Sequence, residues 1–167
     1  DGLKGCEITL TFPSVGATEN VMLAAVKAEG LTILNNPAKE PEIEDLQSFL
    51  NKMGARISGA GSSRIVIQGV KKLSGVTYRS IPDRIVAATY MCAVAGTRGN
   101  ALFKNVVPQH LSAVLSLLSD AGCEIRCYED SVSLECSRLR SVNPVRTMPY
   151  PGFPTDAQSP LMAAACV

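Results

Sequence analysis

The segment Ala24-Ala-Val-Lys-Ala-Glu-Gly30 recurs as Ala93-Val-Ala-Gly-Thr-Arg-Gly99 at a spacing close to 69 residues, and this repeat decides the fold. Later landmarks keep nearly the same offset. Met53-Gly-Ala-Arg-Ile57 corresponds to Ala121-Gly-Cys-Glu-Ile125, and each follows an apolar pattern of helical period. Self-similarity at a fixed period indicates a supersecondary unit that occurs more than once. A third copy begins at Pro154-Thr-Asp156.

The local patterns of the first copy predict a βαβαββ unit. Residues 7–12 alternate with period two, as in a strand, and Gly30 ends a helical pattern. Pro41 and the acidic residues around it suit the first turn of an amphipathic helix. The predicted strands and helices cover, in order, residues 7–12, 17–29, 31–34, 41–53, 55–58 and 64–68. The second copy is expected to repeat the unit through Leu134.

The helices predicted at 17–28 and 85–95 are rich in alanine and apolar around most of their circumference. We therefore expect them to be buried on nearly all sides, with amphipathic helices and sheets packed outside them. Linkers are expected at 74–81 and at 138–154, and the second is long for a plain connection. The chain ends in an apolar helical pattern without an exit loop, so we expect an internal fragment of a longer protein.

Composition excludes several classes of protein. An apolar fraction of 46% excludes disorder, and a balance of 16 basic against 15 acidic residues argues against nucleic-acid or anionic-membrane partners. No apolar run is long enough to cross a bilayer, so we expect no membrane partner and a cytoplasmic location. The six cysteines are expected to be reduced.

Neither a metal ion nor a cofactor is expected. His110 is the one histidine, expected at an exposed helix start, and Cys123 and Cys127 lie four residues apart on a predicted strand with no second pair to complete a metal site. We expect these two cysteines to be buried or edge thiols.

Five motifs together resemble the UDP-N-acetylglucosamine enolpyruvyl transferase family, in order and over almost the whole chain. The motifs are Pro13-Ser-Val-Gly-Ala-Thr-Glu-Asn20, Glu40-Pro-Glu-Ile43, Leu50-Asn-Lys-Met-Gly-Ala-Arg-Ile-Ser-Gly59, Ile81-Pro-Asp-Arg-Ile85 and Pro149-Tyr-Pro-Gly-Phe-Pro-Thr-Asp156. The resemblance implies an α/β (α+β) fold, an inside-out α/β barrel of repeated βαβαββ units in two domains, incomplete in this chain. Residues 1–79 would be the last unit of one domain, and residues 80–167 the first unit and the start of the second unit of the other.

The resemblance also implies an activity and its residues. The enolpyruvyl group of phosphoenolpyruvate would move to the 3-hydroxyl of UDP-N-acetylglucosamine, the first committed step of peptidoglycan synthesis. Phe12, Pro13, Ser14, Val15 and Gly16 match the segment that holds the UDP moiety, and Asp156 matches the candidate base. Thr155 and Arg84 join the substrate-binding set, and the site would lie in a crevice between the domains.

Simpler interpretations stand beside these roles. Ser14 has the sequence context of an ordinary helix N-cap, and Asp156 that of a capping aspartate. Arg84 would then pair with Asp83 or Glu44. Glu40 and Glu42 are two apart and do not share a helix face, so we expect a solvated helix start that offsets the dipole, although a role at the mouth of the cleft stays open.

The family's Gly-Gly-Cys loop, its early Lys-Asn pair and its later arginines have no counterpart here. The remainder of the same polypeptide is therefore an expected partner, and this fragment alone is expected to be inactive. Two alternatives stay open: a 3-phosphoshikimate enolpyruvyl transferase, and a noncatalytic repeat module that binds a partner or a small anion.

Overall fold

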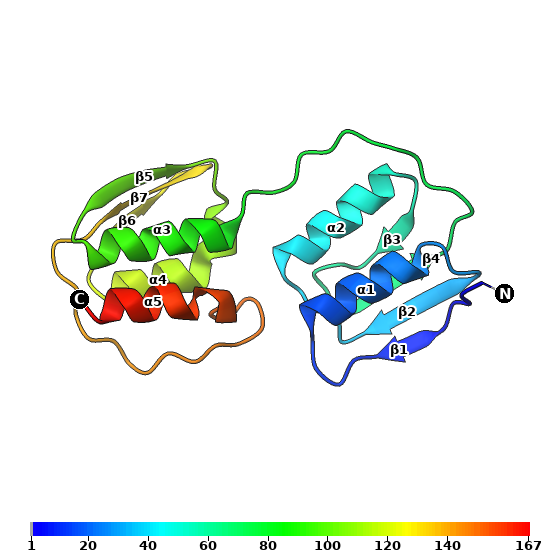
Figure 1. Ribbon diagram of the computed structural model, residues 1–167, viewed down its shortest axis with the longest axis horizontal. Helices are drawn as coiled ribbons and strands as arrows, with labels where there is room; N and C mark the ends of the chain where they lie inside the picture. Colours follow the sequence, from blue (N-terminus) through cyan, green and yellow to red (C-terminus); the bar gives the residue numbers. More distant parts are fainter. Residues whose placement is uncertain (1) are drawn as a thin grey trace. The chain divides into compact units, whose positions relative to one another are not determined.

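The chain folds into two units in the computed structural model, which describes residues 2–167 (Figure 1). One unit ends at Ile81 and the other begins at Pro82. Each unit has its own hydrophobic core, because each buries a separate cluster of apolar side chains.

The first unit confirms the predicted βαβαββ order. Its elements are β1 (Glu7–Thr9), α1 (Val15–Ala25), β2 (Leu31–Asn35), α2 (Pro41–Lys52), β3 (Arg56–Ser58) and β4 (Arg64–Gln68). The strand order in the sheet is β1-β2-β4-β3, with β1 parallel to β2 and the other pairs antiparallel. Met22, Leu34 and Ile43 are fully buried where the two helices meet the sheet.

β1 is shorter than predicted because its partner strand ends. The amide of Leu10 donates to the carbonyl of Asn35 over 3.1 Å, and the next residue of the partner, Asn36, turns away with a φ of 55°. Without a neighbour to pair with, Thr11 and Phe12 leave the sheet instead of extending it.

The first helix also differs from the predicted 17–29, at both ends. It begins directly after Ser14 and ends at Ala25. It ends there because the carbonyl of the next residue, Val26, accepts a tertiary hydrogen bond from the amide of Val70 over 2.9 Å. The chain leaving β4 passes so close here that a Cβ on Gly69 would lie 1.6 Å from the carbonyl oxygen of Ala28. Packing therefore overrides the helical pattern at 26–29.

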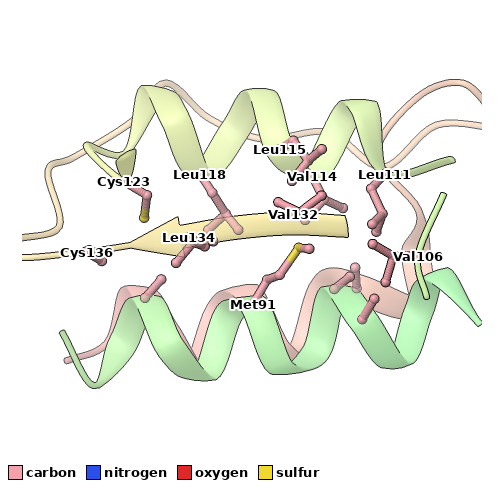
Figure 2. Close-up of a cluster of buried hydrophobic side chains, with 14 of the residues drawn as sticks. Met91, Val106, Leu111, Val114, Leu115, Leu118, Cys123, Val132, Leu134 and Cys136 are labelled. Carbon is pink, nitrogen blue, oxygen red and sulfur yellow. The ribbon is translucent and has the colours of Figure 1, made fainter. Parts of the chain in front are cut away.

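The second unit contains α3 (Arg84–Gly96), β5 (Asn100–Lys104), η1 (Pro108–Leu111), α4 (Ser112–Asp120), β6 (Glu124–Cys127), β7 (Ser131–Glu135), η2 (Thr155–Ala157) and α5 (Gln158–Ala165). Its antiparallel sheet has the order β5-β7-β6, so β6 is an edge strand. Figure 2 shows side chains of α3 and α4 meeting those of the central strand β7, with Met91, Leu118 and Leu134 in the middle of the cluster. Helix α5 packs beside α3.

The second copy was expected to open with a strand, and this prediction was wrong for the described residues. The segment before α3 is held by the first unit instead. The amide of Ser74 donates to the carbonyl of Met53 over 2.8 Å, and the Tyr78 hydroxyl donates to Asp45 Oδ1 over 2.7 Å. The Asp45 hydrogen bond and burial raise the pKa of the Tyr78 hydroxyl. A chain so anchored adds no strand to β5-β7-β6.

The helices expected to be buried on nearly all sides each have an exposed face. Leu23 on α1 is 51% exposed, and Val86 and Tyr90 on α3 are 51% and 63% exposed. The prediction was wrong because the described residues leave one face of each helix uncovered. Among the described residues, no helix is long and apolar enough to span a membrane.

Candidate functional site

Ser14 is the N-cap of α1, as the sequence context predicts. Its backbone is extended, with φ −81° and ψ 127°, and its Oγ accepts a hydrogen bond from the amide of Ala17 over 3.3 Å. The buried side chain of Thr18, whose role the sequence analysis did not predict, holds this turn in place by hydrogen bonds. The buried Thr18 hydroxyl donates to the Ser14 carbonyl over 2.8 Å and accepts from the amide of Ala38 over 2.9 Å. The start of α1 is thereby held in one position.

The surface around this helix start is open. Phe12 is 62% exposed, Gly16 is exposed, and a Cβ added to Gly16 would meet no atom within 4 Å. Pro13 and Val15 are half-buried beneath them. The amides of the first helical turn have no acceptor within the helix, and the helix dipole adds partial positive charge there. A phosphate group can approach this turn without displacing a side chain.

Thr155 and Asp156 form, with Ala157, the single turn η2 that leads into α5. Both side chains are exposed. Among the described residues, no side chain caps η2 or α5 by a hydrogen bond. The alternative interpretation of Asp156 as a capping aspartate was therefore wrong.

The three helix starts of the repeat differ in how they are capped. Ser14 caps α1 and Asp83 caps α3, where the Asp83 carboxylate accepts from the amides of Ile85 and Val86 over 2.8 and 3.0 Å. The third start has polar residues at the matching place, Thr155 and Asp156, but their side chains do not serve as caps. An exposed carboxylate without a capping role is available to a substrate.

Arg84 is half-buried at the first position of α3, and its guanidinium carbon lies 5.5 Å from the centroid of the Tyr150 ring. This cation–π contact was missed, because sequence spacing gives no sign of it. It ties the start of α3 to the proline-rich segment that ends at Asp156. Within the second unit, the structure thus brings Arg84 to the segment of Thr155 and Asp156, whereas residues 12–16 belong to the first unit.

Two further expectations need correction. Glu40 was expected to be solvated, but it is only 8% exposed at the N-cap of α2, where the packed start of the helix covers it. His110 lies in η1 and is half-buried rather than exposed, because its short helix packs against α3 and α4. Among the described residues, no group of three His, Cys, Asp or Glu side chains is placed to hold a metal ion.

All six cysteines are free, and they fall into two groups of three. Cys6, Cys127 and Cys166 are exposed, whereas Cys92, Cys123 and Cys136 are buried. Cys127 on the edge strand and Cys123 in the core agree with the expectation of edge or buried thiols. Burial raises the pKa of Cys92 to about 11, and burial followed by a hydrogen bond with Cys136 raises the pKa of Cys123 to about 12. Neither thiol is an activated nucleophile.

This division predicts selective alkylation. At pH 8, iodoacetamide is expected to label Cys6, Cys127 and Cys166 at least about 100-fold faster than Cys92 and Cys123, because a raised pKa lowers the thiolate fraction tenfold per unit and burial adds to the effect. Peptide mass spectrometry over a time course measures the rates. In denaturant, all six cysteines should be alkylated at similar rates. Equal alkylation rates of exposed and buried cysteines in the native protein as well would contradict the burial of Cys92 and Cys123.

Comparison with known proteins gives consistent results. The sequence model of the EPSP synthase (3-phosphoshikimate 1-carboxyvinyltransferase) family matches residues 1–167. The chain is 52% identical over 166 residues to UDP-N-acetylglucosamine 1-carboxyvinyltransferase 2 of Caldanaerobacter subterraneus subsp. tengcongensis, covering 99% of this chain and 40% of that protein. It is 53% identical over 163 residues to UDP-N-acetylglucosamine 1-carboxyvinyltransferase 1 of Symbiobacterium thermophilum, covering 98% and 37%.

Solved structures show the same fold. The enolpyruvyl transferase NikO from Streptomyces tendae superposes with a TM-score of 0.81 at 24% identity, covering 99% of this chain and 42% of that one. EPSP synthase from Acinetobacter baumannii gives a TM-score of 0.60 at 21% identity, covering 98% and 37%. The predicted fold class is thereby confirmed. The chain spans about 40% of the length of the curated relatives it matches.

Proposed function

Because the chain belongs to the EPSP synthase family of carboxyvinyltransferases, we propose that it is part of an enzyme that transfers the enolpyruvyl group of phosphoenolpyruvate to the 3-hydroxyl of UDP-N-acetylglucosamine. The sugar hydroxyl would add to the enolpyruvyl double bond, and inorganic phosphate would then be eliminated. The observation that carries this choice of acceptor is identity at about half of the positions, along nearly the whole chain, with relatives named for it.

In this proposal, Phe12, Pro13, Ser14, Val15 and Gly16 bind the UDP moiety. Three observations support the role: the open surface at Gly16, the exposed ring of Phe12, and the rigid helix start held by Thr18. The first-turn amides and the helix dipole suit a diphosphate. Binding there would cost little conformational entropy, because the turn is already fixed in the free protein.

Asp156 is proposed as the base that takes the proton of the sugar hydroxyl, with Thr155 and Arg84 as substrate-binding residues beside it. The support is the exposure of Asp156 and its lack of a capping role, together with the contact between Arg84 and Tyr150 in the same segment. An arginine near the reacting centre also suits the negative charge of phosphoenolpyruvate. We propose that residues 1–79 and 80–167 belong to successive domains of the full-length enzyme.

The experiment that tests the function measures phosphate release from phosphoenolpyruvate by the full-length protein that contains this chain. The expected result is release that depends on UDP-N-acetylglucosamine. Release with 3-phosphoshikimate instead would favour the second candidate, which the description of the matching family model supports. Binding of a ligand without turnover of either acceptor would favour the noncatalytic module.

Replacing Gly16 with alanine separates a structural from a binding role. The free energy of unfolding is expected to stay unchanged or to rise by up to about 1 kcal/mol, because the added methyl group meets no protein atom and alanine favours the helix. The affinity for UDP-N-acetylglucosamine is expected to fall at least about tenfold, since the methyl group would occupy the space of the ligand. Titration calorimetry and denaturant unfolding measure the two effects.

Gly75→Ala is the matched control, because a Cβ on Gly75 also meets nothing within 4 Å and this glycine lies outside the proposed site. It should leave affinity unchanged. An affinity of the Gly16→Ala protein equal to that of the Gly75→Ala protein would remove the backbone at Gly16 from the binding site.

The proposed reaction belongs to peptidoglycan synthesis, and through it to wall biogenesis, cell shape, the cell cycle and cell division. A cytoplasmic location is proposed with it. The six free cysteines support this location, because unpaired cysteines are typical of reducing compartments.

A further inference from the structure

We propose that Cys123 and Cys136 are a reversible oxidation site, at which a cross-strand disulfide joins the edge strand β6 to the central strand β7. Cys123 precedes β6 and Cys136 follows β7. The register pairs Glu124 with Glu135, and one step further along the antiparallel ladder Cys123 stands opposite Cys136. Figure 2 shows the two side chains at the same end of the core cluster. This inference does not depend on the proposed function.

The backbone hydrogen bonds favour a close approach of these two side chains. The amide of Cys136 donates to Gly99 over 2.9 Å, and the amide of Cys123 donates to Leu118 over 3.0 Å. Neither amide is used between the two cysteines, so they form a non-hydrogen-bonded pair, in which opposite Cα atoms lie about 4.5 Å apart. Disulfides accept Cα separations from about 4.4 Å upward. Little backbone movement is needed to close the bond.

The two thiols are neighbours in the core. Both residues are buried, at 5% and 1% exposure, and the neighbouring Cys136 contributes, after burial, to the raised pKa of Cys123. Cys92 on α3 is a third buried thiol near Cys123, but it is not part of the β6–β7 ladder. Filling this part of the core with small apolar side chains would not require cysteine at either position, nor two thiols opposite each other.

Access to the pair comes from the edge strand. β6 pairs with one neighbour only, and Glu124, Arg126 and Cys127 on it are exposed. A short edge strand opens locally at a much smaller free-energy cost than the core. Burial shields both sulfur atoms while β6 is closed, so the thiols react only when β6 opens.

The oxidant in this proposal is a low-molecular-weight disulfide. The thiolate of one cysteine attacks a sulfur of that disulfide, which forms a mixed disulfide and releases one small thiol. The second cysteine then loses its proton and attacks the cysteine sulfur of the mixed disulfide, which releases the second small thiol. Two cysteine thiols are oxidised to one protein disulfide, and the small disulfide is reduced to two thiols. An excess of small thiol reverses both steps.

The bond would fix the point at which the chain leaves β7. Cys136 immediately precedes the segment 137–154, and the amide of Arg140 in that segment donates to Ala121 in the α4–β6 turn over 2.8 Å. Crosslinking would hold this turn and β6 closed. Amide hydrogen exchange of β6 is therefore expected to be at least about tenfold slower in the oxidised protein.

The test uses oxidised glutathione on a Cys127→Ser protein, because tryptic peptide 127–138 would otherwise contain two cysteines. After incubation, free thiols are blocked with N-ethylmaleimide in denaturant, and the unreduced digest is mapped by mass spectrometry. The expected product is peptide 105–126 linked to peptide 127–138, reversed by dithiothreitol, with Cys92 in peptide 85–98 blocked. Hydrogen exchange of β6 is compared before and after oxidation.

Cys136→Ala is the control, with circular dichroism to confirm that the variant is folded; it should give no linked peptide. Two results would overturn the proposal. One is a link from Cys123 to Cys92. The other is complete blocking of Cys123 and Cys136 by N-ethylmaleimide at glutathione disulfide concentrations that modify the exposed Cys6 and Cys166.

Discussion

Replacing Asp156 with asparagine in the full-length protein is expected to lower kcat by about 100- to 10,000-fold, the range for loss of a general base. Asparagine keeps the size of the side chain but does not take up the proton of the sugar hydroxyl. The fold should tolerate the change, because Asp156 is exposed and its side chain does not cap η2 or α5. Steady-state phosphate release and denaturant unfolding measure the two quantities.

KM for UDP-N-acetylglucosamine should change much less than kcat, because the proposed role lies in the transition state. The matched control is Asp130→Asn, which alters an exposed carboxylate in the turn between β6 and β7. It should keep full activity. If the Asp156→Asn protein retained kcat within about threefold of the parent, proton transfer would have to be assigned to another group.

Replacing Leu134 with alanine is expected to lower the free energy of unfolding of the second unit by about 2–5 kcal/mol. Leu134 is fully buried on the central strand β7, where it faces Met91 and Leu118 (Figure 2). The shortened side chain would leave a cavity at this junction. Because all three buried thiols lie in the second unit, their labelling in increasing denaturant reports its unfolding separately from that of the first unit.

Leu102→Ala serves as the comparison, because Leu102 is 52% exposed on β5 of the same sheet. Its effect should stay within about 0.5 kcal/mol. A loss below about 1 kcal/mol for Leu134→Ala would mean that this cluster repacks around the missing atoms, contrary to a densely packed core.

Local signals predicted the elements whose ends are set by their own residues. β4 was predicted at 64–68 and α2 within a residue of Pro41–Lys52, because alternation, the N-terminal proline and an apolar stripe all act within the element. The end of α1 was not predictable in this way. Val70, far along the chain, binds the carbonyl of Val26, and only the folded structure shows that contact.

The missing first strand of the second copy has the same cause. The spacing of the repeat predicts a strand before α3. The repeat carries no information about the hydrogen bond from Tyr78 to Asp45, which holds this segment on the first unit. The exposed faces of α1 and α3 were likewise unpredictable, since an alanine-rich pattern describes what a helix can bury and not what covers it.

Residues of the candidate site were predictable where they belong to a local sequence motif. Ser14 was identified as an N-cap from its position before Gly16, and the structure agrees. The supporting residues were not found. Thr18 accepts a hydrogen bond from Ala38, twenty residues further along the chain, and the ring of Tyr150 contacts the guanidinium of Arg84. Such contacts are made by tertiary structure and leave no local pattern.

The edge strands of both sheets carry charged side chains on their exposed positions. These are Glu7 on β1, Arg56 on β3, Lys104 on β5, and Glu124 and Arg126 on β6. A strand from a neighbouring molecule would have to desolvate these charges to continue either ladder, which disfavours fibre-like aggregation. Attraction between molecules is therefore favoured at the apolar helix faces of Leu23, Val86 and Tyr90 over a continuation of either ladder.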